Sequence, residues 1–424
     1  TITVLQGSWI MFDQVSLEGT PQTALTKANG MFVRNVKAAD YELKSNGNKV
    51  QPLLVNTEYL KGSPRISVEL DGKKIFDEAV EKGNYVFEAP MPAVTSSRKS
   101  KYRVLENGKV IEEGVVTRSK QKLQTPAGYV DTRIGTAHSR WMIAPGPWMP
   151  FSMVKMSPDN QNAGWQAGYQ PSYESVGTFS HIHEWTLGGL GIFATNGRLK
   201  TNIGDELKPS SGYRSQIDKK TEEAPIGYYK VQLADYNIKA EVTATTRCGF
   251  ERFTFPKDRD SARVLIDLHI PAEYDYQLKE IKLRKVSDYR IEGSAHQFSP
   301  GIWSHDADQD YTVHFVIEFD KPMKSMGGWI DKKIQHGDTF EAKDIKNAGL
   351  FVQFDAKQTP VVQVRSGISL VSIDNADQNL KTEITRPFGW NFNAVRQNQV
   401  NTWNDIFNRV KITTSDRMEK VRFY

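Results

Sequence analysis

The most restrictive feature of this sequence is the alternation of apolar and polar residues in many short segments. A period of two places every second side chain on one face, as in a half-buried β-strand. Such segments recur up to about residue 388, for example at residues 67–70, 85–87, 261–270, 311–319 and 361–373. Asp71–Gly72 and Asn107–Gly108, which are typical of tight hairpin turns, separate several of them. The pattern predicts an all-β chain over most of its length.

The same pattern suggests three regions. We expect residues 1–124 to form a small accessory β-sandwich-like domain, because short strands and turn signals alternate there. Residues 125–388 are too many for an immunoglobulin-sized domain, so we expect one large β-sandwich. In residues 389–424 the period changes to three and four, which predicts an amphipathic helix with one face formed by Val395, Gln399, Trp403, Ile406, Phe407 and Val410. We interpret this region as a linker helix and the start of a truncated helical domain.

Composition excludes several classes of protein. The formal charge of +5 over 424 residues is small, and its charges are scattered, so no nucleic-acid partner is expected. The single cysteine, Cys248, cannot form an intrachain disulfide and is expected to be a buried free thiol on a strand. No apolar run reaches transmembrane length, and no signal peptide is visible.

The two ends of the sequence suggest a piece of a longer protein. The first residues already alternate like a strand and lack an initiator methionine. Near the other end, Asp416 and Glu419 have the spacing of a helix capping box. We therefore expect a helical domain to follow this region.

Residues 129–191 hold the most unusual side chains of the chain. Taken singly, a tryptophan is usually a core residue, and Pro145–Gly146–Pro147 is usually a turn. Together on irregular backbone, aromatic and imidazole side chains are typical of a loop-built binding site. The cluster comprises Trp141, Trp148, Trp165, Trp185, His138, His181 and His183.

Several motifs in this region occur in the order found in one enzyme family. They are IGT at residues 134–136, PGPWMPFSMVKMSPD at 145–159, GY at 168–169, TFSHIH at 178–183, EEAPIGYY at 222–229, TAT at 243–245 and RFTF at 252–255. This series resembles the N-terminal domain of family 92 glycoside hydrolases, which are calcium-dependent, inverting exo-α-mannosidases. The resemblance runs from about residue 129 to the last residue and leaves residues 1–124 as an added module.

The resemblance implies a β-supersandwich that forms one wall of a sugar-binding cleft. In the family, the general acid, the general base and most calcium ligands lie on a following (α/α)6 domain. It thus implies that this part has no catalytic residues and no metal site of its own, and that its partners are a mannose-containing glycan and its own C-terminal domain. It also implies a periplasmic, cell-surface or extracellular location. Residue 152 is Ser where the family usually has Gly, and residues 184–191 depart from the family pattern, so linkage preference is left open.

On this basis the expected sugar-contacting residues fall into three types. Tryptophan rings can lie against sugar faces, histidines can bond to hydroxyls, and glycines let backbone approach a ligand. A structural reading stays open for the histidines, as satisfied interior residues, and for Trp148, as a buried one. The predicted substrate-binding residues are Gly135, Gly146, Trp148, Trp165, His181, His183 and Trp185.

Three alternatives remain at this stage. One is an independent active site built from the nearby carboxylates Glu174, Glu184 and Asp159, although we expect Asp159 to be a turn or cap residue. The chain can instead be a non-catalytic carbohydrate-binding β-module. Residues 1–124 can also be a cell-surface spacer. A helical domain with acidic cleft residues would distinguish the enzyme from the module.

Overall fold

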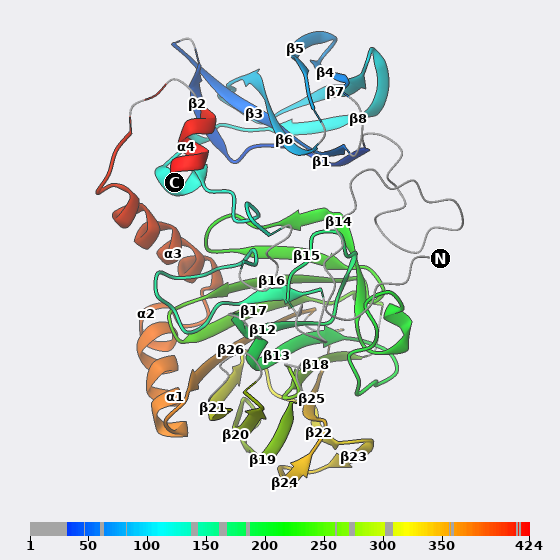
Figure 1. Ribbon diagram of the computed structural model, residues 1–424, viewed down its shortest axis with the longest axis vertical. Helices are drawn as coiled ribbons and strands as arrows, with labels where there is room; N and C mark the ends of the chain where they lie inside the picture. The colour runs from blue at the N-terminus through cyan, green and yellow to red at the C-terminus, as the bar shows by residue number, and fades with distance from the viewer. Residues whose placement is uncertain are drawn as a thin grey trace. The chain divides into compact units, whose positions relative to one another are not determined.

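The computed structural model of the protein is shown in Figure 1. It describes residues 32–45, 47–59, 63–81, 83–136, 143–160, 168–183, 187–258, 261–270, 276–301, 308–355, 357, 360–412, 414 and 417–424. The chain divides into two compact units, Thr1–Gln124 and Thr125–Tyr424. In the described residues, no helix is both long and apolar enough to cross a membrane.

The described part of the first unit is built of two sheets. A five-stranded sheet has the order β1-β3-β2-β9 with β6 also on β3, and a four-stranded sheet has the order β5-β4-β7-β8. The strands are β1 (Phe32–Ala38), β2 (Tyr41–Ser45), β3 (Asn48–Tyr59), β4 (Arg65–Leu70), β5 (Lys73–Ala79), β6 (Gly83–Pro92), β7 (Arg98–Glu106), β8 (Lys109–Arg118) and β9 (Lys122–Leu123). Their inward residues form one apolar core, which includes Leu53, Val55, Ile66, Val68 and Val104.

The predicted hairpin turns of this unit are confirmed. At the β4–β5 turn, Asp71 has φ of 49° and Gly72 of 80°, and at the β7–β8 turn Asn107 has 49° and Gly108 82°. Positive φ at both central residues is what a type I′ hairpin requires, and Asn-Gly or Asp-Gly adopts it most readily. Local sequence therefore determines both turns.

The second unit is a large two-sheet structure. A seven-stranded sheet has the order β10-β12-β13-β18-β25-β22-β23, and a ten-stranded sheet the order β11-β14-β15-β16-β17-β26-β21-β20-β19-β24. The strands of the first are β10 (Ser157–Asp159), β12 (Thr178–His183), β13 (Leu187–Thr195), β18 (Ala262–Asp267), β22 (Ser325–Ile330), β23 (Lys333–His336) and β25 (Ala348–Phe354). Those of the second are β11 (Ser175–Val176), β14 (Ser215–Glu223), β15 (Tyr229–Leu233), β16 (Ile238–Ala244), β17 (Cys248–Thr254), β19 (Gln277–Ser287), β20 (Arg290–Ser299), β21 (Gln309–Phe319), β24 (Thr339–Ile345) and β26 (Val361–Ser369).

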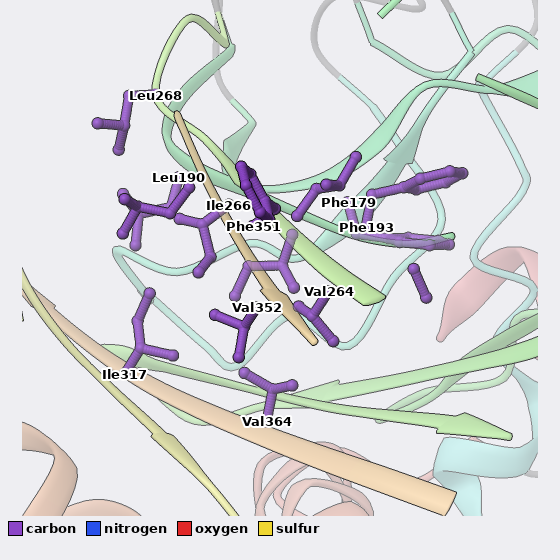
Figure 2. Close-up of a cluster of buried hydrophobic side chains, with 14 of the residues drawn as sticks. Phe179, Leu190, Phe193, Val264, Ile266, Leu268, Ile317, Phe351, Val352 and Val364 are labelled. Carbon is purple, nitrogen blue, oxygen red and sulfur yellow. The ribbon is translucent and has the colours of Figure 1, made fainter. Parts of the chain in front are cut away.

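The main core of this unit joins residues from the two sheets. Figure 2 shows Phe179, Leu190 and Phe193 of the first sheet near Ile317 and Val364 of the second. All five are buried. The predicted all-β class is confirmed.

Helices α1 and α3 pack against the ten-stranded sheet. The described helices are α1 (Ile373–Leu380), α2 (Arg386–Phe388), α3 (Phe392–Phe407) and α4 (Arg417–Phe423), with a π-helical turn at Lys381–Thr385 and 3-10 turns at Pro126–Tyr129 and Pro209–Ser211. Figure 1 shows α1 beside β21 and β26. The outer aromatic of β17, Phe250, joins a second core with Leu380, Phe392 and Val395.

The predicted amphipathic helix is confirmed as α3. Its N-cap is Asn391, whose side chain accepts a hydrogen bond from the Ala394 backbone N–H. Val395 and Gln399 are buried as expected, whereas Val410 lies beyond the end of the helix and is exposed. Helical structure begins earlier than residue 389, because the Ser372 side chain caps α1 by accepting from the Asn375 N–H.

Candidate functional site

The loop before β10 holds one of the predicted glycines in a tight packing position. A Cβ at Gly146 would overlap the Met156 carbonyl oxygen and lie 2.7 Å from Ser157 Oγ. The turn is closed by the Trp148 N–H, which donates to the Gly146 carbonyl at 3.0 Å. Gly146 therefore has a structural role, since it lets the loop lie against the chain entering β10.

Trp148 follows this turn and is half-buried, with its ring contacted by several groups. Its Nε1 donates to Ser157 Oγ at 3.0 Å. The Lys155 ammonium lies 5.2 Å from the centroid of the indole ring, and the His183 ring lies 6.5 Å from it at 34°. These contacts fix the indole while part of it stays exposed.

Helix α3 holds the backbone of the same loop. Trp403 Nε1 donates to the Trp148 carbonyl at 2.7 Å. The fully buried Gln399 donates through Nε2 to the Pro147 carbonyl at 2.8 Å and also to the Ala244 carbonyl. The position of Trp148 thus depends on residues about 250 positions later in the chain.

His183 and Asp159 form a buried pair under this loop. His183 Nδ1 donates to the Lys155 carbonyl at 2.8 Å, because a carbonyl can only accept. Nε2 lies 2.7 Å from Asp159 Oδ1, which also accepts from the Ser180 hydroxyl at 3.0 Å. Burial raises the pKa of Asp159, and the adjacent His183 opposes that rise. The expectation that Asp159 is a turn or cap residue is wrong: it lies within β10 and is fully buried.

His181 lies in the interior, on β12 together with His183. Its Nδ1 is 2.8 Å from the Leu190 carbonyl and its Nε2 is 2.6 Å from Ser366 Oγ on β26. Burial lowers the pKa of His181 to about 4, so at neutral pH it is an uncharged donor to Leu190 and an acceptor from Ser366. Both ring nitrogens of each histidine are bonded within the protein. This favours the structural reading over direct sugar contact for His181 and His183.

The remaining predicted residues are less closely connected with this cluster. Gly135 has φ of 86°, and a Cβ there would lie 2.9 Å from Ile143 Cδ1, so both backbone conformation and packing favour glycine. Trp165 and Trp185 lie outside the described residues, as do Trp141, His138 and Glu184. Glu174 is partly buried, and in the sequence it lies between the Gly168–Tyr169 motif and β11.

Beside this loop, Phe151 is unusual because it is fully exposed and strained. Its relative exposure is 103%, and its φ of 54° is rare for a bulky residue. Ser152, Met153 and Val154 then turn the chain back into the fold, where the N–H groups of Met153 and Val154 donate to the Thr246 carbonyl.

A second polar cluster lies where the sequence motifs at residues 168–169 and 222–229 meet, neither of which supplied a predicted site residue. The partly buried Glu222 accepts from Tyr229 at 2.8 Å and from Tyr169 at 3.1 Å, and its other oxygen lies 3.2 Å from Lys219 Nζ. Burial favours the neutral carboxyl, but Lys219, Tyr229 and Arg133 outweigh it and lower the pKa of Glu222. The motifs at 168–169 and 222–229 therefore meet at one carboxylate. The aromatic and acidic residues of these two motifs were the only signal in the sequence that they meet.

The described residues offer no set of metal ligands. Within the part of the chain that the structure describes, no three His, Cys, Asp or Glu side chains lie close enough together to hold a metal ion. Cys248 is buried on β17 as expected, and burial raises the pKa of its thiol.

Two family models match the chain. The glycosyl hydrolase family 92 N-terminal domain matches residues 129–369, and the glycosyl hydrolase family 92 catalytic domain matches residues 375–424. No curated protein matches it.

Solved structures include similar proteins from Bacteroides thetaiotaomicron. The family GH92 alpha-mannosidase BT3965 has 28% sequence identity and a TM-score of 0.61, over 71% of this chain and 40% of that chain. A complex of the same enzyme with mannoimidazole matches at 28% identity and a TM-score of 0.61, over 70% of this chain and 39% of that one. The family GH92 inverting mannosidase BT2199 shares the fold, with 16% identity, a TM-score of 0.59, and coverage of 70% of this chain and 38% of its own. This chain spans about 40% of the length of BT3965.

Proposed function

Since the chain belongs to glycoside hydrolase family 92, we propose that it forms one wall of the sugar-binding cleft of an exo-acting α-mannosidase. The observation that carries this proposal is the Pro147–Trp148 loop. The indole of the half-buried Trp148 is held by Ser157 and Lys155, and its backbone carbonyl accepts from the helix residue Trp403. An aromatic platform that is fixed before the ligand arrives loses little conformational entropy on binding. Its flat apolar face suits the C–H face of a sugar ring.

We place the bond-breaking chemistry outside the described residues. Inversion needs one carboxylic acid and one carboxylate roughly 6.5–9.5 Å apart on opposite faces of the sugar. Two carboxylates of this unit are already engaged, because Asp159 is buried against His183 and the partly buried Glu222 bonds to Tyr169, Tyr229 and Lys219. We therefore assign no catalytic residue to the described part of the chain.

Calcium dependence is part of the proposal, but the described residues do not fit a calcium site. Calcium takes six to eight oxygen ligands, and no cluster of three candidate side chains is present among these residues. We assign the ion to the further helical domain that we propose as this chain's partner. The role of the present residues is to orient the sugar and keep the platform in place.

The proposed substrate is a mannose-containing glycan, from which the whole enzyme removes terminal α-linked mannose. Support comes from the mannoimidazole complex of BT3965, which is 28% identical to this chain. We further propose that the protein acts in the bacterial envelope or outside the cell, where such glycans are met.

The decisive experiment measures mannose release from α-linked mannobioses, with calcium and with a chelator. It compares this chain with a chain extended through the helical domain. We expect release only from the extended chain and only with calcium. Release by this chain alone would show that its own carboxylates are catalytic, whereas sugar binding without any release from either chain would favour a carbohydrate-binding module.

A matched pair of variants tests the platform in the extended chain. Trp148→Ala removes the ring and should raise KM by about tenfold or more, because the platform acts through binding. Trp148→Phe keeps an aromatic face but loses the hydrogen bond to Ser157. Its KM should therefore lie between that of Trp148→Ala and that of the parent. If Trp148→Ala leaves KM and kcat unchanged, Trp148 does not contact the sugar.

A further inference from the structure

A pocket of about 490 Å³ lies in the second unit, where the segment after β13 meets the start of β14 and the β15–β16 turn. Its size is within the range of small-molecule sites. Most of its lining residues are basic or polar, and they include Arg198, Lys200, Lys208, Arg214, Asp235 and Tyr236.

Two of its cations have no partner of opposite charge. Arg198 and Lys208 are exposed side chains, and in the described residues neither forms an ion pair or a side-chain hydrogen bond. Lys200 is more ordered, because its ammonium donates to the Ser210 carbonyl at 2.9 Å and to the Gly212 carbonyl at 2.7 Å. Carbonyl oxygens orient this charge without neutralising it.

The acidic groups nearby do not balance these charges. Glu206 lies 3.7 Å from the buried Arg214, so it offsets that arginine. Asp235 is the one carboxylate among the lining residues, and it accepts from the Gln216 backbone N–H at 2.9 Å. Asp205 is also close, because its Oδ1 accepts the Lys208 backbone N–H at 3.1 Å. Three further cations against these two carboxylates leave an excess of one positive charge.

A buried arginine behind the wall adds to this excess. Arg263 at the start of β18 is 4% exposed, and its guanidinium donates to the carbonyl of Gly197, which lies between two lining residues. Its Nε and Nη1 have no hydrogen-bond partner among the described residues. A buried cation without a partner is costly, and an anion bound nearby would lower that cost.

We propose that this pocket binds a small molecule through a phosphate or sulfate group, with Arg198, Lys200 and Lys208 as its cationic contacts. Charge-assisted hydrogen bonds to a tetrahedral oxyanion are the interactions that this set of donors makes best. The remaining volume is lined by Asn196, Ser210, Gln216 and Tyr236, which can bond to hydroxyl groups on the body of the ligand. The proposal does not depend on mannosidase activity.

Calorimetric titration of the whole chain at low ionic strength tests it with glucose 6-phosphate, inorganic phosphate and glucose. We expect both phosphates to bind and glucose not to bind, with binding weakened at about 0.15 M salt by screening. Tighter binding of the sugar phosphate would assign an ester as the ligand, and equal binding would assign the free ion. Both results support an oxyanion site, and absence of binding by both phosphates overturns it.

The double variant Arg198→Gln, Lys208→Gln should weaken phosphate binding by about tenfold or more. Its control is Lys332→Gln, Lys333→Gln, which removes the same charge at the exposed β22–β23 turn. Both pairs are exposed, so both variants are expected to fold. Equal loss in the two variants would mean that only net charge matters, and undiminished binding in the first would place the anion elsewhere; either result overturns the proposal.

Discussion

Glu251 on β17 is fully buried, and neither of its carboxylate oxygens has a hydrogen-bond partner among the described residues. Its cross-strand neighbours are Val242 and Val364, both also fully buried. Burial raises the pKa of Glu251 well above its usual range. On the outer face of the same sheet, Glu241 has the opposite environment, because it accepts from Arg252 through both oxygens and from Tyr228. Two glutamates of neighbouring strands thus respond to pH in opposite ways.

Replacing Glu251 by Gln should increase stability at neutral pH. In the folded state the Glu251 carboxyl is kept protonated, whereas in the unfolded state it ionises above a pKa of about 4.3. The parent therefore loses up to about 1.4 kcal/mol of unfolding free energy for each pH unit above that value. This loss continues until the pH reaches the raised folded pKa. Urea unfolding at several pH values between about 5 and 7 measures this effect. The free energy of unfolding of Glu251→Gln should exceed that of the parent by an amount that grows with pH. A constant difference would mean that Glu251 does not titrate as the structure implies.

Replacing Glu241 by Gln should decrease stability at neutral pH by roughly 2–3 kcal/mol. Burial alone would raise the pKa of Glu241. Hydrogen bonds from Arg252 and Tyr228 outweigh this effect and lower that pKa to about 2. Its contribution is therefore complete above the unfolded pKa of about 4.3 and is lost as the pH falls towards 2. The difference between Glu241→Gln and the parent should shrink over that window in urea unfolding, and a difference that persists unchanged to the acid end would contradict this pairing.

At the scale of elements, helix α3 and the Pro147–Trp148 loop depend on one another. Gln399 is buried and donates to carbonyls of the loop and of β16, and Trp403 donates to the Trp148 carbonyl. Gly227 has no room for a side chain here, since its Cβ would lie 3.0 Å from the Arg396 carbonyl and from Gln399 Cβ. The helix is thus fitted to the β-structure and orders a loop of the candidate site.

Gln399→Leu should destabilise the second unit by about 2–4 kcal/mol, because two buried carbonyls would lose their donor. Gln397→Leu is the control, since Gln397 is exposed on the same helix and its side chain donates to Asn401 one turn later. Its effect should stay within about 0.5 kcal/mol. Urea unfolding followed by tryptophan fluorescence measures both, and equal effects of the two variants would show that the buried bonds contribute nothing specific.

At the scale of the whole molecule, each compact unit has an apolar core of its own. One is centred on residues such as Leu53, Val68 and Val104, and the other on residues such as Phe179, Ile266 and Phe351. A domain with its own core can fold without its neighbour. The family 92 match lies entirely in the second unit.

A chain that starts at Thr125 should therefore keep the second unit folded. We expect its unfolding midpoint to lie within about 4 °C of the corresponding transition of the full chain, which is the shift produced by roughly 2 kcal/mol in a unit of this size. Differential scanning calorimetry of both chains measures this. Loss of a cooperative transition in the shorter chain would show that the second unit needs the first.

The sequence by itself determined the features that arise from local patterns. Alternating segments specified strands, Asp71–Gly72 and Asn107–Gly108 specified hairpin turns, and the three- and four-residue spacing from Val395 specified α3. The ordered motifs from residue 134 onward also identified the family correctly. These signals are local because backbone dihedral preferences and side-chain periodicity act over a few residues.

Only the tertiary structure decided what the side chains of the candidate site contact. Sequence placed His181, His183 and Asp159 in one short region. Their partners Leu190, Lys155 and Ser366 lie on β13, in the segment before β10 and on β26, and Ser366 is 185 positions away from His181. The meeting of Tyr169 with Glu222, and of Trp148 with Trp403, is equally non-local. Burial and hydrogen bonding depend on how strands distant in sequence pair and how sheets face each other, and a local pattern of residues does not contain that information.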